Sequence, residues 1–199
     1  MSAELIQSVV PAPPPMPRWT EAHVQNAVYV HCRIKNHEII VPNSCVLGWE
    51  ADVISVNRTG FVSEFEVKVS RSDFKAEAKK EHRRLLTDPV QKSRLFGDVV
   101  HPRPNYFYFA VPVGLVAPEE VPDYAGLLYV HKQVEGHHLY YGTASEVKAP
   151  KRLHREKITD AQRLQLARAL TMRYWRQRMN SVTHEPRESC AGRGDTADS

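Results

Sequence analysis

The stretch that decides the fold is residues 50–70, EADVISVNRTGFVSEFEVKVS. Its first part is rich in β-branched residues, and its middle contains the turn sequence NRTG. Its second part alternates apolar and polar residues strictly. The pattern predicts a β-hairpin whose second strand has an apolar face and an opposite face formed by Glu64, Glu66, Lys68 and Ser70.

The register of this hairpin depends on its turn. If residues 58–60 form a three-residue loop with Gly60 in the left-handed conformation, counting back from the turn places Asp52 opposite Glu66. A two-residue turn would instead place Asp52 opposite Phe65 and scatter the acidic side chains. The sequence leaves both registers open.

A three-residue loop also places Glu50 opposite Lys68, so that three carboxylates and one ammonium group share one end of one face. An exposed sheet face would tolerate such charges without any further role. Helices on both sides of the sheet would bury them, and two carboxylates at cross-strand distance repel unless a cation lies between them. Oxygen ligands of this kind suit Mg²⁺ or Mn²⁺.

The segments around the hairpin predict three helices and further strands, and therefore an α/β fold with a mixed β-sheet flanked by helices. Helices are expected from the N-cap Thr20, from the N-cap Ser72 over Asp73–Leu86, and over Thr159–Arg178. Strands are expected at 37–42, 105–113, 125–132 and 137–142, and 88–104 is expected to be loop or irregular helix. The last helix is expected to turn five side chains toward the core: Leu164, Leu166, Ala167, Leu170 and Tyr174.

The length of 199 residues predicts one domain over 18–180, with a Pro-rich tail at 1–17 and a polar tail at 181–199. No stretch approaches the roughly 18 apolar residues of a membrane span. The three cysteines have irregular spacing, which favours a reduced, cytoplasmic protein without membrane partners. Phosphate-binding, dinucleotide-binding and serine-hydrolase motifs are absent from the sequence.

Basic residues gather in two runs, although the whole chain has a net charge of only +4. One run lies on the expected second helix and the other spans Lys148–Lys157. Such runs follow a nucleic-acid backbone in some proteins and form a solvated helix face in others. Two other groups have simpler structural explanations: the His31–Cys32 neighbours as core filling, and His131, His137 and His138 as surface or strand residues.

Asp52, followed after thirteen residues by Glu66-Val67-Lys68, resembles the signature of PD-(D/E)xK nucleases. The family's proline before the aspartate is replaced by Ala51. The segment EVKVSRSDFKAEAKK is similar to the corresponding segment of MmcB-like DNA-repair proteins and phage-encoded relatives. The later segments NYFYFAVPVGL and EEVPDYAGLLYV look like those relatives too, so the resemblance covers roughly residues 20–175.

The resemblance implies a restriction-endonuclease-like core and a metal-dependent nuclease site. Its implied catalytic residues are Asp52, Glu66 and Lys68, with Glu21 as an accessory acidic residue, and its implied metal ligands are Asp52, Glu66 and Val67. Glu50 and Glu64 are neighbours with open roles. Contacts to DNA are expected from the second helix, through Lys75, Lys79, Lys80 and Arg83.

The leading hypothesis is therefore a Mg²⁺- or Mn²⁺-dependent endonuclease acting on duplex or branched DNA in phage or bacterial recombination, repair or restriction. The first alternative is a non-catalytic nucleic-acid- or partner-binding protein that keeps the nuclease fold. The second is an unrelated α/β enzyme, which a wide separation of Asp52 and Glu66 would favour. Two-strand cutting often requires a homodimer, and the sequence leaves the oligomeric state, the DNA structure and the role of Lys68 open.

Overall fold

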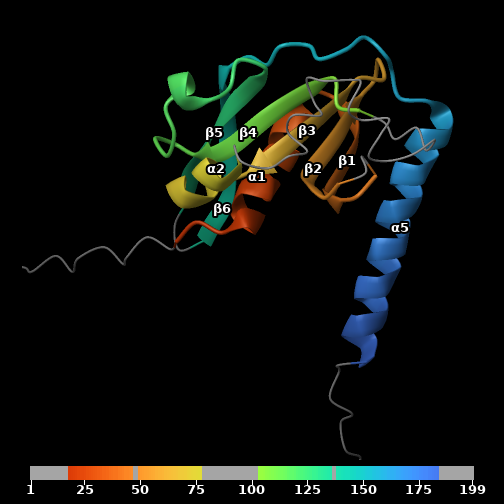
Figure 1. Ribbon diagram of the computed structural model, residues 1–199. Helices are drawn as coiled ribbons and strands as arrows, with labels where there is room; N and C mark the ends of the chain where they lie inside the picture. Colours follow the sequence, from red (N-terminus) through yellow and green to blue (C-terminus); the bar gives the residue numbers. More distant parts are fainter. Residues whose placement is uncertain (1–17, 47–48, 78–102, 136–137, 184–199) are drawn as a thin grey trace, which may run out of the picture.

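The structure is a computed structural model that describes residues 18–46, 49–77, 103–135 and 138–183. Its described elements form a six-stranded open sheet of order β1-β2-β3-β4-β5-β6, flanked by helices (Figure 1). The predicted α/β class with a mixed sheet is therefore confirmed. In chain order the elements are α1 (Glu21–Ile34), β1 (His37–Ser44), β2 (Ala51–Asn57), β3 (Val62–Val67), α2 (Arg71–Glu77), β4 (Tyr106–Pro112), a 3₁₀ turn η1 (Pro118–Glu120), β5 (Ala125–Glu135), β6 (His138–Lys148) and α5 (Asp160–Thr183).

The sheet combines two kinds of strand pairing. The pairs β1–β2, β2–β3 and β5–β6 are antiparallel, whereas β3–β4 and β4–β5 are parallel. The two parallel pairs lie in the middle of the sheet, and every residue of β3 is buried. Parallel strands are covered on both faces in most proteins, so the charged residues of β3 lie inside the molecule.

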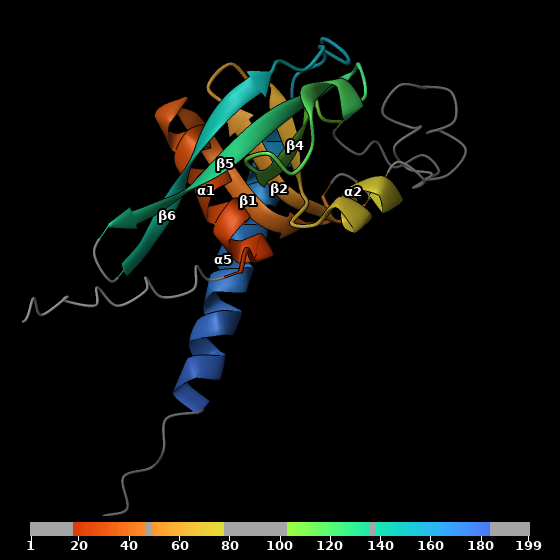
Figure 2. The ribbon, with the colours of Figure 1, turned by 90° about the vertical axis from the view of Figure 1, so that its left-hand side faces the viewer.

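One face of the sheet is covered by α1 (Figure 2). The buried face of this helix packs against apolar residues of β2–β5, including Val53 and Phe65. The opposite face holds two further clusters. Phe74 of α2 packs with Phe107 and Phe109, and Leu166 of α5 packs with strands β1–β3. Glu64 and Glu66 belong to this second face, because they alternate with the inward-facing residues of the α1 side.

The helix starts follow local hydrogen bonds. Thr20 caps α1 as predicted, since its hydroxyl accepts from the backbone N–H of His23. The predicted cap of the second helix was wrong by two residues. This helix begins at Arg71, and Ser70 rather than Ser72 accepts from the backbone N–H of Asp73. Ser70 precedes the first helical residue, which is where a capping side chain must lie.

The predicted core face of the last helix was largely wrong. Leu166 is buried and Leu170 is half-buried, but Leu164, Ala167 and Tyr174 are exposed. Leu164 and Leu166 lie about 200° apart around a helix, so they cannot both face the sheet. Helix α5 contacts the domain as far as Arg173, and its described residues beyond that point project from the domain (Figure 1).

The other expected elements agree with the structure where it describes them. The strand at 105–113 is β4, buried along most of its length, and the strands near 125 and 137 are β5 and β6. Helix α5 continues to Thr183, three residues past the expected domain end. The first three residues of the expected tail at 181–199 are helical, whereas the rest of it, the expected tail at 1–17, most of 88–104 and the second part of the expected helix to Leu86 lie outside the described residues.

Candidate active site

The hairpin turn has the geometry that places the acidic residues together. Gly60 has a φ of 89°, a left-handed conformation that glycine adopts without steric cost. The backbone N–H of Asn57 donates to the carbonyl of Phe61 (3.0 Å), which closes the three-residue loop. Of the two registers that the sequence left open, the structure has the one with Gly60 at the left-handed position.

This register brings Asp52 to Glu66. Val53 pairs with Phe65, so the preceding residue, Asp52, lies opposite Glu66 and on the same face. The regular pairing ends here, and the Asp52 carboxylate accepts from the backbone N–H of Val67 at 2.7 Å. Asp52 thus closes the end of the hairpin where the two strands separate. The backbones of Asp52 and Glu66 are therefore neighbours across the hairpin.

Lys68 lies between two buried carboxylates. Its Nζ is 2.6 Å from Glu66 Oε1 and 2.9 Å from Glu77 Oε2, and the Glu77 side chain is only 1% exposed. Burial of a charged pair requires good geometry and further hydrogen bonds, because both ions lose water. Lys68 therefore compensates part of the charge that β3 and α2 bring into the interior.

The surroundings keep Lys68 protonated. Burial by itself lowers the pKa of a lysine, but the hydrogen bonds and negative charges of Glu66 and Glu77 outweigh it and raise the pKa of Lys68 above its usual value. In this arrangement Lys68 is a cation rather than a base. Of the two roles that the sequence allowed, electrostatic stabilisation of a charged transition state fits this state.

Glu64 lies one pleat before Glu66 on the same face and is completely buried. Its Oε1 accepts from the indole N–H of Trp49 at 3.0 Å. This contact joins the start of the hairpin to its second strand, and it gives a carboxylate in the interior a polar partner. Glu64 is therefore a buried neighbour of the site rather than an exposed charge.

A hydrogen-bonded group at the start of α1 connects Glu21 with Asp52. The Gln25 amide Nε2 lies 2.9 Å from Glu21 Oε1, 2.6 Å from Asn43 Oδ1 and 3.2 Å from the backbone carbonyl of Asp52. Glu21 itself is exposed. Gln25 thus links Glu21 to the backbone of Asp52, while α1 covers the sheet face opposite the Asp52 and Glu66 side chains.

Other predicted residues are not drawn into this group. Glu50 is exposed and precedes β2, and the paired part of the hairpin does not reach it. Lys75 is an exposed residue in the last turn of α2. Lys79, Lys80 and Arg83 lie outside the described residues.

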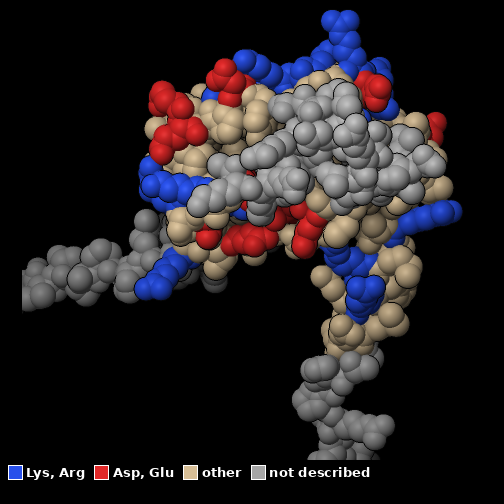
Figure 3. Space-filling model, in the orientation of Figure 1, with Lys and Arg blue, Asp and Glu red and all other residues tan. Residues whose placement is uncertain are grey.

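Figure 3, in the orientation of Figure 1, shows acidic side chains gathered on one face of the molecule, with basic side chains on α5 beside them.

The sequence reasoning missed Glu77, Trp49 and Gln25. Glu77 follows Phe74 by three residues, so both lie on one side of α2, and a helical projection would have placed it toward the apolar core. Trp49 and Gln25 act through long-range hydrogen bonds for which the sequence offers no periodic signal.

The donor atoms of this site are of the kind that Mg²⁺ prefers. The carboxylates of Asp52 and Glu66, with the carbonyl of Val67, are hard oxygen ligands, and Mg²⁺ commonly binds one or two carboxylates while keeping several waters. Within the described part of the chain, no group of three or more His, Cys, Asp or Glu side chains is arranged to hold a metal. Two carboxylates and a carbonyl match Mg²⁺ in the type of donor atom only.

The Cys32 thiol on α1 is not a second reactive centre. Cys32 is fully buried, and this burial raises its pKa to about 12, so it stays protonated. Cys32 is a packing residue, as interpreted, whereas the half-buried His31 lines a cavity and contacts the backbone carbonyl of Ala144. His131, one of the histidines expected to be surface or strand residues, contacts Ser145 Oγ at 2.9 Å.

Among the described residues no helix is both long and apolar enough to cross a membrane.

Comparisons with known proteins bear on the fold alone. No family model matches the chain, and no curated protein matches it. A solved structure, the SPO1766 protein of unknown function from Silicibacter pomeroyi, is similar with a TM-score of 0.51 and 20% sequence identity. The match covers 83% of this chain and 94% of that chain. At this identity the chain shares an α/β fold with an uncharacterised bacterial protein.

Proposed function

We propose that this protein is a Mg²⁺-dependent DNA endonuclease of the PD-(D/E)xK type. The observation that carries the proposal is the register of the hairpin, which sets Asp52 opposite Glu66 and leaves Lys68 bonded to Glu66. Two carboxylates and an ammonium group at the open end of one hairpin are the groups that phosphodiester hydrolysis requires.

Hydrolysis adds water across one P–O ester bond. The water oxygen bonds to phosphorus, the ester bond breaks, and the leaving alcohol takes a proton. Asp52 and Glu66 would hold the metal with the carbonyl of Val67, and a bound Mg²⁺ supplies an acidified water and neutralises phosphate charge. Lys68, as a cation, stabilises the negative charge that develops on the phosphate, and Glu77 orients Lys68.

The test is cleavage of supercoiled plasmid and branched DNA by the purified protein, in Mg²⁺ and in EDTA. We expect nicking or cutting with Mg²⁺, with a loss of at least about 100-fold in Glu66→Ala and in Lys68→Ala, because each removes a charge-stabilising group. Glu119→Ala, an exposed glutamate on η1, is the matched control and should cut like the wild type. Equal cutting by wild type and both site variants would refute the mechanism.

A second function is favoured by one feature of the site. The Asp52 carboxylate already accepts from the amide of Val67, and Glu66 is already bonded to Lys68. A protein that keeps the nuclease fold but binds DNA or a partner without cutting would have such internally bonded carboxylates. Calorimetric titration with Mn²⁺ separates the two functions: heat lost in Asp52→Asn supports the nuclease, and salt-sensitive DNA binding without any metal effect supports the binding protein.

The proposed nuclease function also implies where in the cell the protein acts. Recombination, repair or restriction in a bacterial cell or a phage-infected host takes place in the cytoplasm. The cytoplasmic location and a homodimeric state stay predictions. Sedimentation of the purified protein with and without duplex DNA measures whether it is a homodimer.

A further inference from the structure

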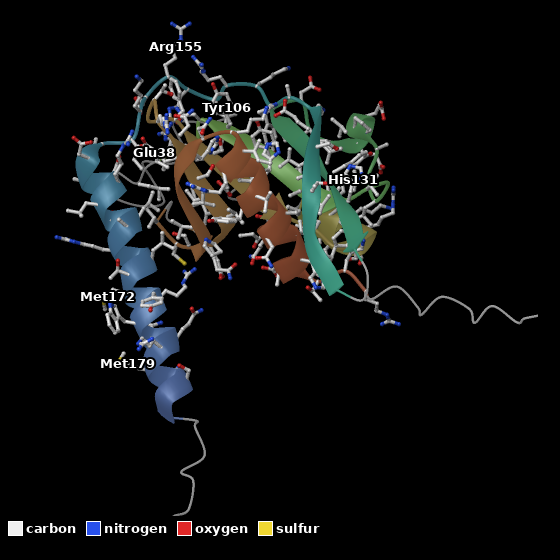
Figure 4. The ribbon with its side chains drawn as sticks, turned by 180° about the vertical axis from the view of Figure 1, so that it is seen from behind. Glu38, Tyr106, His131, Arg155, Met172 and Met179 are labelled. Carbon is white, nitrogen blue, oxygen red and sulfur yellow. The ribbon has the colours of Figure 1, made fainter. Side chains whose placement is uncertain are left out.

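Residues 148–178 are strongly basic. They contain ten Lys or Arg and two acidic residues, a net charge of +8, whereas the whole chain has +4. These basic residues lie at the end of β6, on the segment before α5, where Figure 4 labels Arg155, and along α5 itself. Two of them, Arg176 and Arg178, lie on the last part of α5, where no acidic residue accompanies them, and such a positive segment attracts a polyanion.

The last part of α5, residues 174–183, is an arm that no other described element covers. Every described side chain from Tyr174 to Ser181 is exposed. A solvent-surrounded helix of about this length is only marginally stable in water, so a binding partner would stabilise it. The arm and the turn before it carry four large exposed side chains: Met172, Tyr174, Trp175 and Met179. Figure 4 labels Met172 and Met179.

Two of these side chains are aromatic and are flanked by arginines. Tyr174 is 57% exposed and Trp175 is 53% exposed, and their rings meet edge to face with centroids 5.6 Å apart. Arg178 lies one turn beyond them on the same side of the helix, and Arg176 follows Trp175 directly. Exposed aromatic rings beside arginines can stack unpaired bases while the arginines contact phosphates.

The arm begins beside the candidate active site. Arg173 of α5 donates to the backbone carbonyls of Pro42 and Asn43, and its contact with Asn43 is 2.5 Å long. The Asn43 side chain accepts from Gln25, which also reaches the backbone carbonyl of Asp52. One hydrogen-bonded chain thus leads from the base of the arm to the acidic pair.

We propose that the arm binds single-stranded DNA and holds it at the entrance to the Asp52–Glu66 site, an assignment that rests on the proposed function for its choice of DNA. Charge decides against a second copy as the partner, since two arms laid side by side would bring arginines against arginines. In duplex DNA the ring faces are covered by stacking between neighbouring base pairs, so Tyr174 and Trp175 match an unpaired strand. The preferred substrate is therefore a junction, flap or end with a single-stranded part.

The experiment measures binding without cleavage. Fluorescence anisotropy of a labelled 20-nucleotide oligo(dT) is recorded in EDTA over a range of salt concentrations, with blunt duplex DNA for comparison. We expect Arg176→Ala/Arg178→Ala to weaken binding about tenfold and to reduce the salt slope by about 1.4, or ~0.7 for each lost phosphate contact. Trp175→Ala should weaken binding about tenfold, and Trp175→Phe should retain most of it because a phenyl ring still stacks.

The matched control is Arg33→Ala/Lys35→Ala, which removes two exposed charges at the far end of α1. It should bind like the wild type, and thermal unfolding should show all variants folded. Oligo(dT) binding that is absent in the wild type, or unchanged in both arm variants, overturns the proposal. So does a wild-type dimer in sedimentation that Trp175→Ala converts to monomers, since the arm would then be covered by a second copy. Because no metal is used, loss of binding in the arm variants supports the arm even if Glu66→Ala leaves cleavage unchanged.

Discussion

At the scale of single residues, Lys68 has two buried acidic partners, and this makes it important for stability. It is the cation between Glu66 and Glu77, two carboxylates that are almost completely buried. Removing one partner of a buried charge group leaves the other charges without compensation, whereas replacing both can be nearly neutral. The lysine therefore stabilises the fold and serves the proposed reaction with the same contacts.

We expect Lys68→Ala to lower the free energy of unfolding by about 3 kcal/mol, because it leaves buried carboxylates behind. Adding Glu77→Gln to Lys68→Ala should recover part of this loss, since one of the stranded charges is removed. Urea denaturation of the wild type, both single variants and the double variant gives the coupling between the two residues.

The control for this cycle is an exposed ion pair, Lys151 with Asp123, whose side chains are 69% and 91% exposed. Lys151→Ala should leave the urea midpoint unchanged, because water screens such pairs. Additive losses for Lys68→Ala and Glu77→Gln would contradict the role of Lys68 as the shared cation.

At the scale of elements, α5 separates what can be inferred from a sequence from what cannot. Its existence and start were predictable from helical periodicity, but its buried side was not, because leucines lie on two sides of it. The packing of Leu166 against strands β1–β3 decides the orientation, and that contact is long-range.

The two leucines of α5 provide a direct comparison. Leu166→Ala should destabilise the protein by about 2–5 kcal/mol, because a buried leucine leaves a cavity. Leu164→Ala, the same substitution two residues earlier at a side chain that is 51% exposed, should change stability by less than about 0.5 kcal/mol. Thermal and urea unfolding measure both, and equal losses would mean that α5 packs through a different face.

The hairpin shows a case in which local signals went further. The alternation at 64–70 predicted the second strand, and the Gly60 turn left two registers, of which the structure has the one that sets Asp52 opposite Glu66. The contact between Glu77 and Lys68 could not be predicted from such local signals. Their contact depends on how α2 packs through Phe74 on β4, which no local pattern reports.

At the scale of the whole molecule, three histidines make the stability depend on pH. Burial lowers the pKa of His31, His37 and His154, and nearby positive charges contribute, from Lys35 at the first two and Arg103 at the third. In the folded protein these side chains are therefore neutral at a pH at which the unfolded chain already binds protons. Stability should be complete above the unfolded pKa of about 6.5 and should fall as pH drops below it.

We expect the unfolding temperature to decrease between pH 7.5 and pH 5.5, a range above the usual titration of carboxylates. The combined variant His37→Asn/His154→Asn should show a smaller decrease, because two of the three sites no longer take up a proton in the unfolded state. Differential scanning calorimetry at both pH values gives the comparison. An identical decrease in wild type and variant would assign the effect to other groups.

The mixture of strand pairings also sets the order in which the molecule can fold. Asp52 and Glu66 belong to a hairpin closed by a three-residue loop, a local contact that forms rapidly. The parallel pair Ser63–Tyr106 joins residues far apart in the chain, and closing such a long segment is slow. The acidic pair therefore meets early in folding, while the strand that buries it arrives late. The burial of Glu66 therefore depends on the slow, long-range step rather than on the formation of the hairpin.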